Sequence, residues 1–99
     1  NTYNQFQYLY TDYGCMNEKV FTPKITITKN DNGKYNVAIK YPNVMDMMDG
    51  FRYVYRLGKE DDIEVQGSEV TGLSVTSGTK ITAEIQRGEY LIRQITEIA

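Results

Sequence analysis

The chain of 99 residues contains no histidine and no tryptophan, and it has a single cysteine. Histidine is the side chain whose ordinary pKa lies nearest neutrality and is the commonest metal ligand, so its absence removes most routes to acid–base and metal chemistry. Cys15 cannot form an internal disulfide, and without a histidine to hold it as a thiolate we expect a buried or incidental thiol. We therefore expect a non-catalytic protein with no metal and no cofactor.

Long apolar runs and a strong charge bias are also missing. No run approaches the roughly 20 apolar residues that cross a bilayer, so we expect no membrane span. Net charge is −2; residues 1–57 carry seven Lys/Arg against five acids, and residues 58–99 carry four against eight. This asymmetry is too mild to predict a polyanion-binding protein, although it makes the first half the one that would face an anionic ligand.

Length and composition predict one soluble globular domain spanning residues 1–99. An apolar share of 40% with 24% charged residues is ordinary for such a domain, and the length suffices for a single two-layer core. Because the chain starts at Asn1 instead of methionine, we expect that an upstream segment was removed, by a signal peptidase or by truncation. Because these two causes are not distinguished, the sequence predicts no particular cellular compartment.

A β-hairpin is the clearest local pattern. Lys24 to Lys29 and Lys34 to Tyr41 both alternate apolar and polar residues, and Asn30-Asp31-Asn32-Gly33 between them tolerates the dihedral angles of a tight turn. The alternation places the side chains of Ile25, Ile27, Tyr35, Val37 and Ile39 on one face.

A second alternating run covers residues 51–57, with its aromatic residues on one face and Arg52, Val54 and Arg56 on the other. After it, glycines recur at positions 58, 67, 72, 78 and 88 between short β-branched runs, which is typical of a sandwich or barrel. We predict an all-β, mostly antiparallel protein: a small β-sandwich or partly open β-barrel of six to eight strands.

Three segments allow more than one interpretation. Isoleucines in residues 79–99 also fall at helical spacing, but Gly88 disfavours a helix, so we favour a hairpin that turns at Arg87-Gly88-Glu89. Residues 43–49 form the one plausible short helix, and the methionines from Met45 to Met48 suit a core plug, a docking surface or a Cu(I) site. Residues 5–10 resemble an edge strand that would allow dimerisation.

Tyrosine is the abundant residue, with nine copies, four of them in the first thirteen residues beside Phe6. Tyrosine gives a large contact area with one polar tip at low entropic cost, which favours recognition of another protein through an aromatic-rich β surface and loops. The alternation also predicts that Tyr35, Tyr53 and Tyr55 face the core. The candidate binding residues are Tyr3, Phe6, Tyr8, Tyr10, Tyr13, Tyr53, Tyr55, Arg52 and Arg56.

Two other functions are compatible with the composition. Aromatic and arginine residues on strands are the components of a single-stranded nucleic-acid-binding barrel of the OB type, although Arg52 and Tyr53 point to opposite faces. A small carboxylate-dependent hydrolase needs two converging acids, one of them buried. The acids here occupy turns, such as Asp62, or polar strand positions, such as Glu64, Glu84 and Glu97, so we expect them to face solvent.

Overall fold

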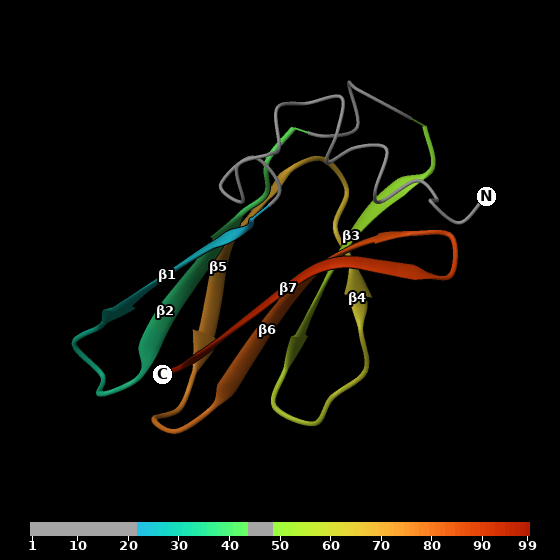
Figure 1. Cartoon of the computed structure of the whole chain (residues 1–99). Helices are drawn as coiled ribbons and strands as arrows, with labels where there is room; N and C mark the ends of the chain where they lie inside the picture. Colours follow the sequence, from blue (N-terminus) through green and yellow to red (C-terminus); the bar gives the residue numbers. More distant parts are fainter. Residues whose placement is uncertain (1–21, 44–48) are drawn as a thin grey trace.

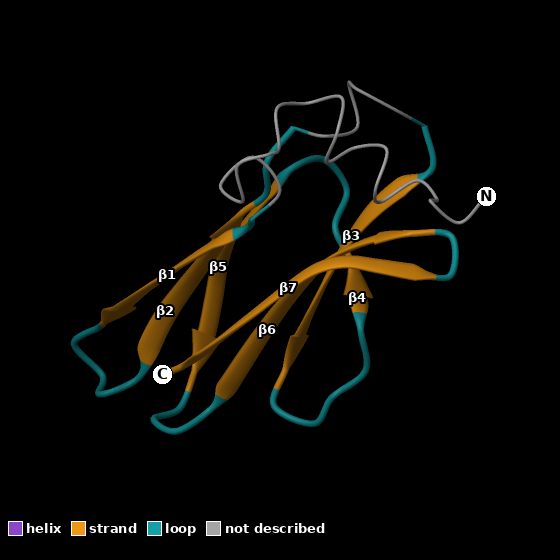
Figure 2. Cartoon of the chain, viewed as in Figure 1, coloured by secondary structure: helices purple, strands orange, loops and turns teal. Residues whose placement is uncertain are grey.

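The protein is a two-sheet antiparallel β-sandwich. The computed structural model describes residues 22–43 and 49–99, and in this part of the chain every regular element is a strand. One sheet has the order β1-β2-β5 and the other β4-β3-β6-β7 (Figure 1 and Figure 2). The strands are β1 (Lys24–Lys29), β2 (Tyr35–Lys40), β3 (Phe51–Leu57), β4 (Ile63–Glu64), β5 (Glu69–Val75), β6 (Lys80–Arg87) and β7 (Tyr90–Ile98).

This architecture confirms the all-β prediction and selects the sandwich over a closed barrel. The sheets are separate and face each other across one core. The short helix was predicted over residues 43–49, and residues 44–48 of it, including the methionines from Met45 to Met48, lie outside the described residues.

The predicted first hairpin is confirmed. Strands β1 and β2 pair with Ile25 opposite Ile39 and Ile27 opposite Val37. The turn closes on Asn30, whose side-chain oxygen accepts hydrogen bonds from the backbone N–H groups of Asn32 and Lys34 at 2.9 and 3.2 Å. Gly33 has a φ of +80°, a left-handed conformation that glycine adopts without strain. Turn residues between two alternating segments were thus sufficient to predict this hairpin from neighbouring residues alone.

The C-terminal region is a hairpin and not a helix. Strands β6 and β7 pair along their length, and Gly88 lies in the turn between them with a φ of +60°. Ile85 lies opposite Arg93 whereas Gln86 lies opposite Leu91, so Ile92 is an extra residue, a β-bulge. The bulge turns Ile92 into the core, where only 5% of it is exposed.

The core lies between the sheets and is built largely from β2, β3 and β6. Tyr41, which follows β2, stacks on Tyr53 of β3 with ring centroids 4.6 Å apart. The Tyr41 hydroxyl donates to the backbone oxygen of Val54 at 2.7 Å, and the Tyr53 hydroxyl donates to that of Pro42. These contacts tie the two sheets together. The buried apolar cluster consists of Val37, Ile39, Tyr41, Phe51, Tyr53, Tyr55, Val65, Val75, Ile81, Ala83, Ile85 and Ile92.

Candidate functional site

The structure divides the predicted binding residues into three groups. Tyr3, Phe6, Tyr8, Tyr10 and Tyr13 lie outside the described residues. Their role stays a prediction.

Tyr53 and Tyr55 belong to the core. They are 1% and 7% exposed, because alternation along β3 directs both rings to the inner face, against the apolar residues of β6. Their rings therefore offer no surface to a partner, and we correct their assignment as binding residues. The alternation of residues 51–57 predicted this position of Tyr53 and Tyr55 in the core.

Arg52 and Arg56 lie on the outer face of the four-stranded sheet, where each contacts a carboxylate. Arg56 Nη1 lies 2.6 Å from Asp62 Oδ1, and Arg52 Nη1 lies 3.8 Å from Glu64 Oε1. The hydrogen bond to Asp62 is the main reason that the pKa of Arg56 is raised above its usual range. Both guanidinium groups are therefore already matched by negative charge within the chain.

Glu84 is the buried acid of this outer face, with 7% of it exposed. Its Oε1 accepts a hydrogen bond from Gln86 Nε2 at 2.8 Å, and its Oε2 accepts from Gln94 Nε2 at 2.6 Å and from Arg56 Nη2 at 3.4 Å. We expected Glu84 to face solvent, and this was wrong because the long side chains of β3, β6 and β7 close over the carboxylate. Buried carboxylates require such partners.

The four sheet edges in the described part of the chain differ in how they are protected. Free strand edges invite pairing with other chains, and proteins block them with lysine, proline, short strands or irregular geometry. Strand β1 carries Lys24 and Lys29 and follows Pro23, and β4 has only two residues. Strand β5 is interrupted by a register shift and by Gly72, whose φ is +78°.

Strand β7 is the longest of these edges, and its only irregularity in the described pairing is the bulge at Ile92, near one end. It has nine residues, Tyr90–Ile98, and contains neither lysine nor proline. Tyr90, Leu91 and Ile98 are 58%, 53% and 61% exposed, which is high for large apolar side chains. A long edge strand with exposed apolar residues is the kind of element that pairs with an added strand.

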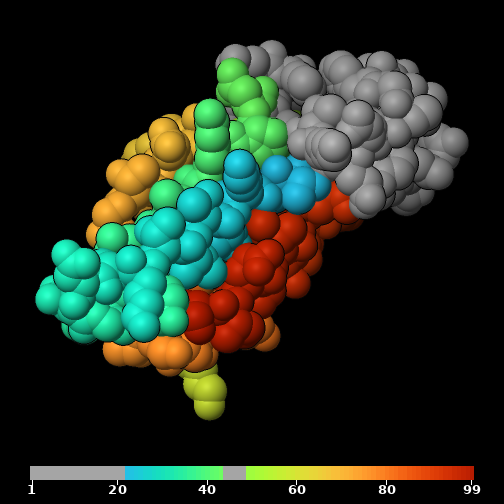
Figure 3. Space-filling view, turned by 90° about the vertical axis from the view of Figure 1, so that its left-hand side faces the viewer, coloured from blue at the N-terminus to red at the C-terminus, as the bar shows by residue number. Residues whose placement is uncertain are grey.

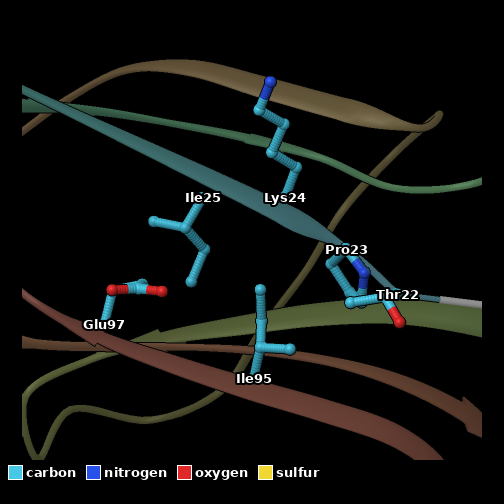
Figure 4. Close-up of a pocket in the computed structure, with 6 residues that line it drawn as sticks. All are labelled: Thr22, Pro23, Lys24, Ile25, Ile95 and Glu97. Atoms are coloured by element: carbon cyan, nitrogen blue, oxygen red, sulfur yellow. The ribbon is translucent and has the colours of Figure 1, made fainter. Parts of the chain in front are cut away.

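A groove runs along the inner side of this edge, where β7 faces β1. Figure 3 shows the two edge strands side by side, β1 in blue and β7 in red. The groove has a volume of about 490 Å³, and Ile25 and Ile95 project into it from opposite strands while Lys24 points away (Figure 4). Its other lining residues are Thr22, Pro23 and Glu97. The open side of the sandwich therefore has an apolar centre.

Sequence reasoning did not identify β7 as the exposed edge. The order of strands in a sheet depends on long-range pairing, which a single sequence does not reveal. A signal was nonetheless present, because residues 90–98 combine five large apolar residues with no lysine and no proline. The sequence interpretation placed an edge strand at residues 5–10, outside the described residues.

In residues 22–43 and 49–99, no group of three or more acidic or cysteine side chains lies close enough to hold a metal ion. In the same residues, no helix has the length and apolar character needed to span a membrane. Fold and site thus define a small two-sheet β-sandwich with a long edge strand, β7, that carries exposed apolar residues. Comparison with protein families, with curated proteins and with solved structures finds no match for this chain.

Proposed function

We propose that the protein is a non-catalytic binding module that recognises another protein by accepting an extended strand beside β7, an edge strand of the described four-stranded sheet. The observation that carries the proposal is the nine-residue edge strand itself, with exposed Tyr90, Leu91 and Ile98 and the apolar groove beside it. In strand addition, backbone hydrogen bonds supply affinity and alternate side chains supply specificity. The backbone of β7 would supply the hydrogen bonds, and the apolar groove beside it would contact alternate side chains of the added strand.

The non-catalytic part of the proposal is supported by the chemistry of the charged residues. The chain has no histidine, and both oxygens of the buried Glu84 accept hydrogen bonds from neighbouring side chains. A hydrolase of the carboxylate type needs an acid positioned to exchange a proton with substrate. Glu84 is instead held by Arg56, Gln86 and Gln94, which suits a structural role.

The nucleic-acid alternative receives less support. Binding of single strands requires exposed aromatic rings beside cations that are available to phosphate. Tyr53 and Tyr55 are buried in the core, while Arg52 and Arg56 are matched by Glu64, Asp62 and Glu84. The outer face therefore has neither stacking rings on β3 nor uncompensated arginines.

The aromatic residues of the first thirteen positions stay a predicted second contact region. Phe6, Tyr8 and Tyr10 alternate with Gln5, Gln7 and Leu9, as in a strand with its aromatic side chains on one face. A Tyr8→Ser/Tyr10→Ser variant tests whether this region contributes to the same partner.

The test of the proposed function is a cross-linking pull-down with three chains: native, Thr96→Pro and Thr96→Val. Proline at an outward-facing edge position removes one N–H without breaking the β6–β7 ladder, and valine keeps that N–H. We expect native and Thr96→Val chains to capture the same partner and Thr96→Pro to lose at least ten-fold of it. Capture that is equal for all three folded chains, or no capture by any, would overturn the proposal.

A further inference from the structure

The turn between β1 and β2 contains Asn32 followed by Gly33, the one Asn-Gly pair in the 99 residues. In such a pair the backbone nitrogen of the glycine can attack the side-chain amide carbon of the asparagine. The product is an unstrained five-membered ring, and glycine has no side chain that obstructs the attack. Whether this happens in a folded protein depends on how firmly the turn holds the two groups.

The side chain of Asn32 is exposed and free of hydrogen bonds within residues 22–43 and 49–99. Only its backbone N–H is held, by Asn30 Oδ1 at 2.9 Å. The side chain of Asn30 is fixed instead, because it accepts from two backbone N–H groups and donates to Asn36 Oδ1 at 3.1 Å. Asn32 is therefore the asparagine of this turn whose amide group can rotate toward the backbone.

The nitrogen of Gly33 is weakly restrained. Its N–H donates to the backbone oxygen of Asn30 at 3.3 Å, beyond the usual upper limit of about 3.2 Å, so this bond opens easily. Apart from the adjacent residues of the chain, no heavy atom lies within 4 Å of the position that a Cβ of Gly33 would occupy. The turn lies at the tip of the β1–β2 hairpin (Figure 1), so both reacting groups have room and access to water.

We propose that Asn32 is a site of spontaneous modification, at which the folded chain converts asparagine to isoaspartate and aspartate. The Gly33 nitrogen gives its proton to solvent and bonds to Asn32 Cγ, and the Cγ–Nδ2 bond breaks to release ammonia, which takes up a proton. Water then opens the succinimide ring. Cleavage of its Cγ–N bond gives aspartate, and cleavage between the nitrogen and the main-chain carbonyl carbon gives isoaspartate. One water is consumed, one ammonium ion is released, and nothing is oxidised or reduced.

Conversion changes the turn in two ways. A carboxylate replaces a neutral amide next to Asp31, so two like charges become neighbours. Isoaspartate also adds one methylene to the backbone between the N–H groups of residue 32 and Lys34, which both donate to Asn30 Oδ1. We expect the modified chain to exchange the N–H of Asn30 faster, because its 2.8 Å bond to the oxygen of Lys34 closes the same turn. The modification does not depend on recognition at β7, and either can fail alone.

The test is tryptic peptide mapping of the folded chain after incubation in warm, mildly alkaline buffer. Cleavage after the flanking lysines gives the peptides 30–34 and 35–40, so one digest compares Asn32 with Asn30 and Asn36. Mass spectrometry locates the change from amide to carboxylate, and chromatography separates isoaspartyl from aspartyl peptides. We expect Asn32 to convert at least ten-fold faster than either of the other two asparagines, with isoaspartate among the products.

Two glycine substitutions test the route of the reaction. Gly33→Ala places a side chain beside the attacking nitrogen, and we expect it to slow the conversion of Asn32 at least ten-fold. Gly78→Ala is the matched control, because Gly78 has a φ of +89°, close to the +80° of Gly33, and equally open surroundings, but follows a serine. Both substitutions strain the backbone in the same way, and only the first alters the reacting pair.

Three outcomes would overturn the proposal. Asn32 could stay unconverted in the folded chain while it converts in a guanidinium-unfolded sample, which would show that the turn protects it. Asn30 or Asn36 could convert as fast as Asn32. Equal rates in the native and Gly33→Ala chains would show that attack by the nitrogen of residue 33 is not the route.

Discussion

At the scale of single residues, Tyr41 connects the two sheets through both its ring and its hydroxyl group. Its ring stacks on Tyr53, and its hydroxyl donates to the backbone of Val54. Burial raises the pKa of the Tyr41 hydroxyl well above its usual range, and the nearby Tyr55 and Glu84 act in the same direction. The folded state therefore favours the neutral phenol.

The raised pKa predicts how stability changes in alkaline solution. The unfolded chain releases the Tyr41 proton near pH 10, while the folded chain retains it to higher pH. The contribution of Tyr41 is thus complete below about pH 10 and is lost as pH rises further. We expect the free energy of unfolding to fall as pH rises above about 10, and to fall less steeply in Tyr41→Phe, as measured by urea denaturation.

At neutral pH, Tyr41→Phe should unfold with a free energy about 1 kcal/mol lower, because it loses one buried hydrogen bond. Tyr90→Phe is the matched control, since Tyr90 is exposed and its replacement should change the free energy of unfolding by less than about 0.5 kcal/mol. If the free energy of unfolding fell equally steeply with rising pH in the native and Tyr41→Phe chains, the raised pKa of Tyr41 would not be the cause of the decrease.

At the scale of elements, the bulge in β7 decides which side chains reach the core. Regular alternation would put Ile92 on the face opposite to Arg93, yet the extra residue turns Ile92 inward and leaves Leu91 exposed. The bulge also offsets residues 90 and 91 from the regular part of β7, which begins at Arg93. The regular stretch from Arg93 to Ile98 is therefore the part of β7 that we propose pairs with an added strand.

The bulge predicts opposite outcomes for two neighbouring substitutions. Ile92→Ala removes a buried side chain and should lower the free energy of unfolding by about 2 to 4 kcal/mol. Leu91→Ala removes a side chain that is largely in solvent and should change it by less than about 0.5 kcal/mol. Chemical denaturation of both variants measures the difference; equal losses, or a larger loss for Leu91→Ala, would show that the register is different.

The two hairpins show how far sequence reasoning reaches. Asn30 to Gly33 between alternating runs predicts the first hairpin, and Gly88 predicts the last one, because turn chemistry and alternation act over neighbouring residues. The burial of Glu84 was missed because it depends on Gln94 and Arg56, which only long-range strand pairing brings together. The bulge at Ile92 and the edge position of β7 arise in the same way.

At the scale of the whole molecule, two regions of the sandwich differ. Charged side chains on the outer face of the four-stranded sheet are paired with one another, whereas the edge at β7 carries exposed apolar side chains. The outer face of β3 and β6 satisfies its charges internally through Arg56 and Glu84, so it has little left to offer a partner. The side where β1 faces β7 presents apolar residues instead, and both strands are edges of their sheets in the described part of the chain. This distribution of charge and apolar surface favours recognition at β7 over recognition at the outer face.

A pull-down with native, Thr96→Pro and Thr96→Val chains tests this placement most directly. The N–H of Ala99 faces β6, so the N–H of Thr96, three residues earlier, faces away from it; proline removes that N–H and valine keeps it. We predict that the Thr96→Pro chain loses at least ten-fold of the captured partner while the Thr96→Val chain retains it. Equal capture by all three folded chains would contradict recognition at β7.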